Sequence, residues 1–149
     1  MTIADLQPDI ALKVLLDGKV QAEAPSGKMV TLKVFADGEH GNKDADDEYI
    51  EILYNGNPDD VTTDRTLWEG NLAVYLRCKM QTNTSVKTSR MRLILKQIEP
   101  LVHCVRSQGY FFKFAPQPIT PPQRDYTTGY AYALYNVAWR YNDLSTEKQ

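Results

Sequence analysis

The side chains that could carry catalysis are few, and none stands in a known catalytic pattern. The chain has two histidines, His40 and His103, and two cysteines, Cys78 and Cys104, and it contains no H-E-x-x-H, C-x-x-C or G-x-S-x-G motif. His103 and Cys104 fall on a segment predicted to be helical. Adjacent helical side chains diverge by about 100°, so we do not expect these two to meet as base and nucleophile. Both cysteines are predicted to be small core hydrophobes.

Two loops contain residue types that bind ligands in other proteins. The segment 26–28 (SGK) resembles the end of a phosphate-binding loop, but the first glycine of that motif is missing and Met29 replaces the magnesium-binding hydroxyl. The acidic loop at 44–48 (DADDE) could gather oxygens around a hard cation such as calcium, yet it lacks the central glycine and terminal glutamate of an EF-hand. We interpret it as solvated charge, with His40 exposed, and predict no metal site.

Basic and aromatic side chains raise the possibility of a nucleic-acid site. Arg77 and Lys79 are expected on the wet face of a strand beside Tyr75. The basic residues that follow in the sequence are Lys87, Arg90, Arg92 and Lys96. The RNP-like string is absent, and a sequence pI of about 5.7 argues against general phosphate affinity. A binding module for nucleic acid or a small ligand, with an aromatic pocket of Tyr75, Tyr130 and Tyr132, therefore remains the alternative function.

Hydrophobic periodicity predicts an α+β domain. Alternating residues predict strands at 29–36, 49–55, 71–81, 110–114 and 130–141, and apolar positions three and four apart predict a helix from about 85 to 109. The element order is (α)βββαββ. We expect a mainly antiparallel sheet of about five strands, packed against one or two helices.

The two helices rest on different signals. Pro8, Asp9 and Gly18 favour a short first helix, although the same stretch also alternates with strand period. Its predicted buried face is Ile10, Ala11, Val14 and Leu15. The second helix is predicted to begin at Ser85 and end at Gly109, with Pro100 kinking it or ending its regular part. Its predicted apolar stripe is Met91, Ile94, Leu95, Ile98, Leu101, Val102 and Val105.

The last third of the chain is rich in proline and tyrosine. The segment 115–129 carries four of the eight prolines and is predicted to be an extended arm or loop, because such a segment cannot be a central strand. The strand at 130–141 has large side chains on both faces. We expect it to be covered on both sides, with the second cover supplied by another chain or, alternatively, by its own domain.

Length and composition indicate one globular domain over residues 1–149, with a flexible tail from about residue 143. No apolar run approaches roughly 18 residues, the N-terminus is unlike a signal peptide, and two cysteines cannot form a disulfide framework. We therefore expect a soluble protein made in a reducing compartment. Residues 1–70 carry 6 basic and 15 acidic side chains (net −9), and residues 71–149 carry 11 basic and 4 acidic (net +7). This asymmetry predicts either an acidic and a basic surface on one body or two halves that interleave.

The order of these elements and their residue patterns resemble those of a known protein family. A strand like MVTLKVFA, an acidic loop leading to DEYIEILYN, the strand NLAVYLRCKM, a helix, GYFFKF and TGYAYALYNVAWRY follow one another over residues 3–141. The chain in this respect resembles the tail terminator and neck (head–tail joining) proteins of long-tailed bacteriophages.

The resemblance implies a structural virion protein that assembles in the host cytoplasm. Such a subunit would form a homo-oligomeric ring, expected to be a hexamer, that caps the tail tube and joins it to the head connector. It would have no enzymatic activity and no cofactor, and DNA would pass through without sequence readout. The loops at 37–48 and 55–70 would face tube and connector. We predict the subunit interface at Tyr130, Tyr132, Tyr135, Trp139, Arg140, Arg124 and Asp125.

Overall fold

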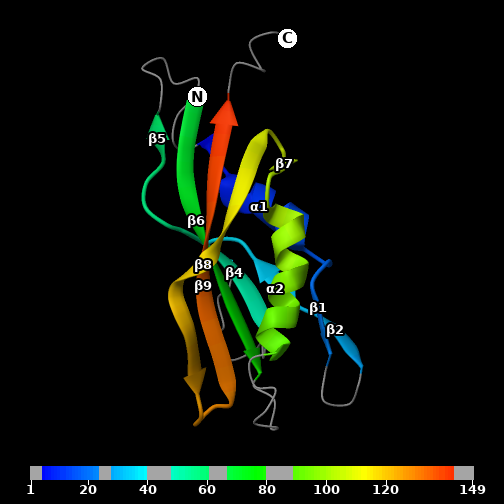
Figure 1. Ribbon diagram of the computed structural model, residues 1–149. Coiled ribbons are helices and arrows are strands. Elements are labelled where there is room, and N and C mark those ends of the chain that lie inside the picture. Colours follow the sequence, from blue (N-terminus) through cyan, green and yellow to red (C-terminus); the bar gives the residue numbers. More distant parts are fainter. Residues whose placement is uncertain (1–4, 24–27, 40–47, 61–66, 80–88, 143–149) are drawn as a thin grey trace.

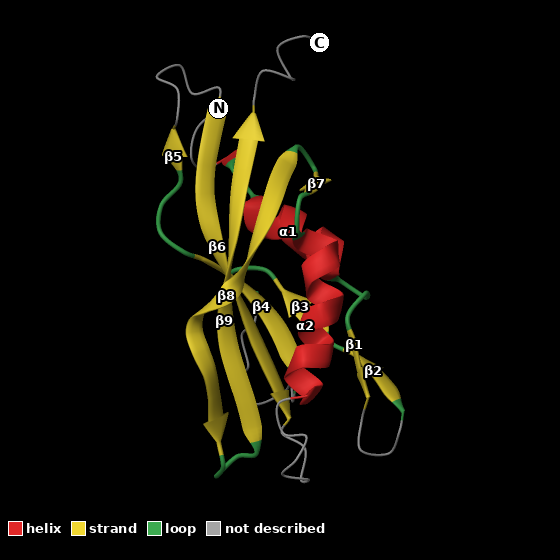
Figure 2. Ribbon diagram, in the orientation of Figure 1, coloured by secondary structure: helices red, strands yellow, loops and turns green. Residues whose placement is uncertain are grey.

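A computed structural model describes residues 5–23, 28–39, 48–60, 67–79 and 89–142. It has two layers, a long twisted sheet and two helices that lie together on one of its faces (Figures 1 and 2). The elements in chain order are α1 (Pro8–Leu16), β1 (Gln21–Glu23), β2 (Met29–Thr31), β3 (Lys33–Phe35), β4 (Tyr49–Tyr54), β5 (Asp59–Asp60), β6 (Leu67–Lys79), α2 (Ser89–Val102), β7 (Val105–Ser107), β8 (Tyr110–Asp125) and β9 (Tyr130–Asn142). No helix in these ranges is long and apolar enough to cross a membrane.

The α+β class is confirmed, but the sheet is larger than expected and mixed. Its seven strands run in the order β3-β4-β6-β9-β8-β7, with β5 paired to β6. β3 and β4 are parallel and the other neighbours antiparallel. The prediction of about five, mainly antiparallel, strands missed β5 and β7 and the parallel pairing of β3 with β4. Each of these three strands has three residues or fewer, too short to show a period.

The first helix is confirmed, but its predicted buried face is only half right: Ala11 is buried and Leu15 partly buried, whereas Ile10 and Val14 are not. Proline stands at the start of α1, and the Asp17 N–H closes its last turn onto the Lys13 carbonyl at 2.8 Å. Ile10 and Val14 are 38% and 49% exposed. The residues that α1 buries are Pro8, Asp9, Ala11, Leu12 and Leu16. Two apolar stripes compete on this helix, and packing against β4 and α2 selects between them.

The second helix ends earlier than predicted. Its residues Met91, Ile94, Ile98 and Val102 are buried, as expected. It ends at Val102, two residues after Pro100. Gly109 is therefore no helix cap: with Gln108 it forms the two-residue turn from β7 to β8, and both have positive φ, 86° and 52°. The predicted start at Ser85 lies outside the described residues.

The predicted strand at 29–36 is two strands in two different sheets. The Leu32 N–H donates to the Val20 carbonyl at 2.9 Å, which interrupts the strand between β2 and β3. β2 pairs with β1 as a separate ribbon, so Val30 is 45% exposed, whereas Val34 on β3 is buried. The alternating apolar residues are therefore divided between the β1–β2 ribbon and the large sheet.

The prediction of an extended arm or loop at 115–129 is wrong. Its physical reason, that prolines exclude a central strand, still holds. β8 continues from Tyr110 to Asp125 and pairs with β9 through three register shifts, between Phe114 and Gln123. β7 covers only its first three residues. From Lys113 onward β8 is thus an edge strand, the position that tolerates prolines.

A glycine in the central strand β6 makes room for the largest core side chain. Gly70 lies opposite Trp139 in the register, and a Cβ at residue 70 would lie 2.7 Å from Trp139 Cζ2. Trp139 is 2% exposed. The ring therefore packs directly on the backbone of β6.

Substituting Gly70→Ala should lower the free energy of unfolding by about 1–3 kcal/mol, because the added methyl overpacks a site with no free volume. Urea denaturation would measure the loss. Asn71→Ala, at the exposed neighbouring residue, is the control and should cost much less. An unchanged midpoint for Gly70→Ala would contradict this account of the packing.

Candidate interaction face of the sheet

The two faces of the sheet differ in what covers them. The helices pack on the face formed in β9 by Ala131, Ala133, Tyr135, Val137 and Trp139, all buried. No described helix covers the opposite face, which we call the open face. Register and alternation assign to it Phe35, Tyr49, Glu51, Tyr75, Arg77, Lys79, Phe111, Lys113, Tyr130, Tyr132, Leu134, Asn136 and Arg140.

The predicted interface residues separate into two groups. Tyr135 and Trp139 lie in the core of their own chain, 5% and 2% exposed. They contact Phe114 and Tyr110, each with ring centroids 5.7 Å apart. Of the other five, Tyr130, Tyr132 and Arg140 lie on the open face. Arg124 and Asp125 end β8 beside the turn, and there Arg124 pairs with Ala131 of the helix-side face.

Aromatic rings from four neighbouring strands form a row across the open face. The centroids of Phe35 and Tyr49 are 6.0 Å apart, those of Tyr49 and Tyr75 are 5.8 Å apart, and those of Tyr75 and Tyr132 are 6.1 Å apart. Along the row, the exposed fraction of the side chain rises from 2% at Tyr49 to 37% at Tyr132. Beside it, the Arg77 guanidinium lies 4.2 Å from the Tyr130 ring centroid. Phe35 and Tyr49 escaped sequence reasoning because only strand pairing brings them to Tyr75.

Burial raises the pKa of a tyrosine within this row. The pKa of the Tyr75 phenol is raised to about 12, first because burial disfavours the phenolate and then because of nearby Tyr49. On the helix side of the same strand, burial raises the pKa of the Cys78 thiol to about 12, with the Glu48 carboxylate adding to the rise.

These shifts predict a loss of stability at alkaline pH. The folded chain holds both groups protonated, whereas the unfolded chain ionises them near their ordinary values of 9.0 for Cys78 and 10.0 for Tyr75. The stabilisation is complete below about pH 9 and falls as pH rises from about 9 to about 12. Urea midpoints should fall over this range, and less steeply in Tyr75→Phe. Constant midpoints from pH 8 to pH 11 would contradict the prediction.

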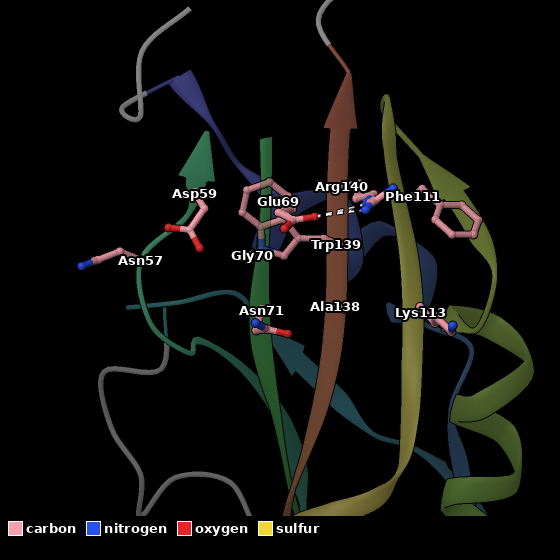
Figure 3. Close-up of a pocket in the computed structure, with 10 residues that line it drawn as sticks. All are labelled: Asn57, Asp59, Glu69, Gly70, Asn71, Phe111, Lys113, Ala138, Trp139 and Arg140. Carbon is pink, nitrogen blue, oxygen red and sulfur yellow. Dashed lines mark hydrogen bonds and ion pairs between the residues drawn. The ribbon is translucent and has the colours of Figure 1, made fainter. Parts of the chain in front are cut away.

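The far end of the open face holds a cavity of about 570 Å³ (Figure 3). Its floor is formed by the small residues Gly70 and Ala138 on the central strands. Asp59 on β5 stands at one side, and Phe111 and Lys113 on β8 stand at the other (Figure 3). The remaining lining residues are Asn57, Glu69, Asn71, Trp139 and Arg140. Arg140 and Glu69 form an ion pair at 3.3 Å within it, so the cavity presents both signs of charge and an aromatic ring.

The predicted basic patch is divided by the fold. Arg77 and Lys79 lie on the open face, but Arg92 and Lys96 stand on α2, behind the sheet. Arg90, expected off the apolar stripe, is only 5% exposed and forms an ion pair with Glu48. Such a surface cannot present all these cations to one phosphate backbone.

The acidic loop gives no metal centre among the described residues. Glu48 is its one described carboxylate, and Arg90 engages it. The segment 44–47 and His40 lie outside the described residues, as do Ser26 and Gly27 of the phosphate-loop-like segment. Across the described ranges no three His, Cys, Asp or Glu side chains gather in a metal-binding group.

His103 and Cys104 meet, contrary to the expectation from helical geometry. The helix ends before them, Cys104 has a φ of 56° and is exposed, and its Sγ lies 3.6 Å from His103 Nε2. The His103 Nδ1 accepts the Phe114 N–H at 3.2 Å, so the neutral ring carries its proton on Nε2. The imidazole therefore donates toward the sulfur and is not placed to remove a thiol proton.

The strand order places the two halves of the chain, which differ in net charge, on opposite sides of β6. β3, β4 and β5, from the acidic first half, lie on one side of β6, and β9, β8 and β7, from the basic second half, lie on the other. Exposed charges on the first side include Asp37, Asp59 and the cation Lys33, and on the second side Arg106, Lys113 and Arg124. Within the sheet the halves are separated, not interleaved.

A scan against protein-family models finds no match to this chain, and neither does a search of curated proteins. The features of this chain that bear on function are therefore the open face, its cavity and the separated charge.

Proposed function

We propose that the chain is a structural subunit that assembles with copies of itself into a closed ring, expected to be a hexamer. The resemblance in element order supports the more specific role of a phage tail terminator or neck protein. In that role the ring caps the tail tube and joins it to the head connector of the virion. It performs no catalysis, needs no cofactor and lets DNA pass without sequence readout.

One observation carries the proposal: exposed basic side chains predominate on the β9, β8 and β7 side of the sheet, whereas the exposed acidic side chains Asp37 and Asp59 lie on the β3, β4 and β5 side. Such a body can dock the basic edge of one copy on the acidic edge of the next, which is a heterologous contact. Heterologous contacts repeat around an axis and close into a ring when the rotation fits. The contact would use Arg124 on one side and Asp59 on the other.

The open face supports the same conclusion. Tyr132 and Tyr130 lie at the exposed end of an aromatic row, and tyrosine is enriched in the energetically important centres of protein interfaces. The adjacent β8 edge contains four prolines, which lack the N–H that pairing with another strand needs. Assembly through side chains of the open face is therefore favoured over extension of the sheet.

Native mass spectrometry over a concentration series, with negative-stain imaging, tests the proposal. A dominant closed ring near six copies is the expected result. A chain that remains monomeric throughout would contradict self-assembly. Arg77→Ala serves as a stability control, because its cation–π contact lies on the surface and its loss should leave the fold intact.

A specific observation favours a second candidate, a monomeric binding module. Tyr75, Tyr132, Tyr130 and Arg77 lie together on the open face, an arrangement of stacking rings and a cation that suits single-stranded nucleic acid. Titration of a fluorescent oligonucleotide at low and high salt would distinguish the two. Salt-sensitive binding that Tyr132→Ala abolishes, by a monomer, would favour this candidate.

A further inference from the structure

The turn between β8 and β9 presents a tyrosine on a rigid support. Tyr126 is 67% exposed, the highest value among the large apolar side chains of the described residues. Asp125 Oδ1 accepts the N–H groups of Thr127 at 3.0 Å and Thr128 at 3.3 Å. The Gly129 N–H donates to the Asp125 carbonyl at 2.8 Å. These bonds order the turn before any partner arrives, which lowers the entropic cost of binding.

The cavity at the other end of the open face has the chemistry to receive a tyrosine. Its volume of about 570 Å³ lies within the range of ligand pockets. The carboxylate of Glu69 can accept a phenol hydrogen, and the ring of Phe111 and the cation of Lys113 can contact an aromatic face. On the floor, Ala138 projects only a methyl group, which leaves the depth that a ring needs.

The turn and the cavity cannot meet within one chain. Tyr130 begins β9 at the turn, and Arg140 lies in the cavity ten residues along the strand, a distance of about 33 Å. Both belong to the same rigid sheet. A turn that fills this cavity must therefore come from a second copy.

One exposed charge at each end is of opposite sign to one at the other end. Arg124, next to the turn, and Asp59, at the wall of the cavity, are both exposed. Neither forms an ion pair with another residue in the described ranges. A tyrosine inserted from a second copy would bring its neighbouring arginine toward this acidic wall.

The geometry points to a head-to-tail contact in which Tyr126 of one subunit enters the cavity of the next, with Arg124 facing Asp59. This inference rests on the proposed function, because it names the contact that builds the ring. Tyr126 (the knob) and the cavity (the hole) are different surfaces of the chain, so the contact is heterologous and can repeat.

Sedimentation velocity over a concentration series tests this contact with two complementary variants. Tyr126→Ser removes the knob and Ala138→Phe fills the hole, and each should weaken self-association at least about tenfold, as loss of an interface hot spot does. An equal mixture of the two should form heterodimers, because one intact knob still meets one intact hole. Circular dichroism of both variants should match the wild-type chain.

A charge swap gives an independent test. Arg124→Glu and Asp59→Arg should each weaken association, and the double variant should recover it because the pair is restored between copies. Arg92→Glu on α2 is the control and should have no effect. If the wild-type chain associates and these variants associate equally, the contact is wrong while the ring proposal stands. If the wild-type chain stays monomeric, both are overturned.

Discussion

Replacing Trp139 by alanine should lower the free energy of unfolding by about 3–5 kcal/mol, as is usual for deleting a large buried aromatic side chain. Trp139 is 2% exposed, packs edge-on against Tyr110 at 5.7 Å, and fills the space that Gly70 leaves. Urea denaturation of the monomer at low protein concentration would measure the loss. The effect falls on folding, although sequence analysis placed this side chain at a subunit interface.

Two controls separate the core role of Trp139 from an interface role. Trp139→Phe should cost clearly less, because a ring remains and the Nε1–H has no hydrogen-bond partner to lose among the described residues. Tyr132→Ala, on the open face of the same strand, should change stability by less than about 1 kcal/mol. A Trp139→Ala chain that unfolds like the wild type but assembles poorly would contradict the core assignment.

Replacing Arg90 by methionine should cost a similar amount, about 3–5 kcal/mol, because it leaves a buried carboxylate without its counter-charge. The Arg90 and Glu48 side chains are 6% and 10% exposed and make two hydrogen bonds, at 2.6 and 2.8 Å. Glu48 also accepts the Lys79 N–H at 2.8 Å, so the pair ties the start of α2 to the ends of β4 and β6. Thermal and urea denaturation would measure the loss.

The double variant Glu48→Gln/Arg90→Met decides whether the unpaired charge causes this loss. Glutamine keeps an acceptor for Lys79 and removes the negative charge, so the double variant should recover much of the stability. Arg92→Met, two residues along the same helix and exposed, is the matched control and should have little effect. Equal losses in Arg90→Met and the double variant would show that packing of the arginine stem matters more than charge.

Local pattern predicted β6, β9 and α2 well, but not the length of β8. The alternation in β6 and β9 and the three-and-four spacing in α2 are properties of neighbouring residues, so each could be read along the chain. The end of α2 could not, because a glycine at position 109 fits a helix cap and a hairpin turn equally well. Its partner Gln108, with positive φ, shows which one forms.

The candidate site was predictable only in part. The tyrosines of β9 indicated that its faces would both be occupied, yet not that Tyr135 and Trp139 lie inward while Tyr130 and Tyr132 lie outward. Faces of a strand are assigned by the elements that pack on them, here α1 and α2. Tyr75 and Tyr132 were predicted to lie together, and their ring centroids are 6.1 Å apart. The cavity and the extension of the aromatic row to Tyr49 and Phe35 were not predictable, because they depend on which strands pair.

The sequence by itself determined the α+β class, the strands β6 and β9, the apolar stripe of α2 and the opposite charge of its two halves, because periodicity and composition are local. Only the tertiary structure decided the strand order that places those charges on opposite edges. It also decided the buried pairing of Arg90 with Glu48 and the close packing of Trp139 on Gly70. These depend on residues 42 and 69 positions apart in the chain, and contact between such residues is set by the packing of the whole sheet.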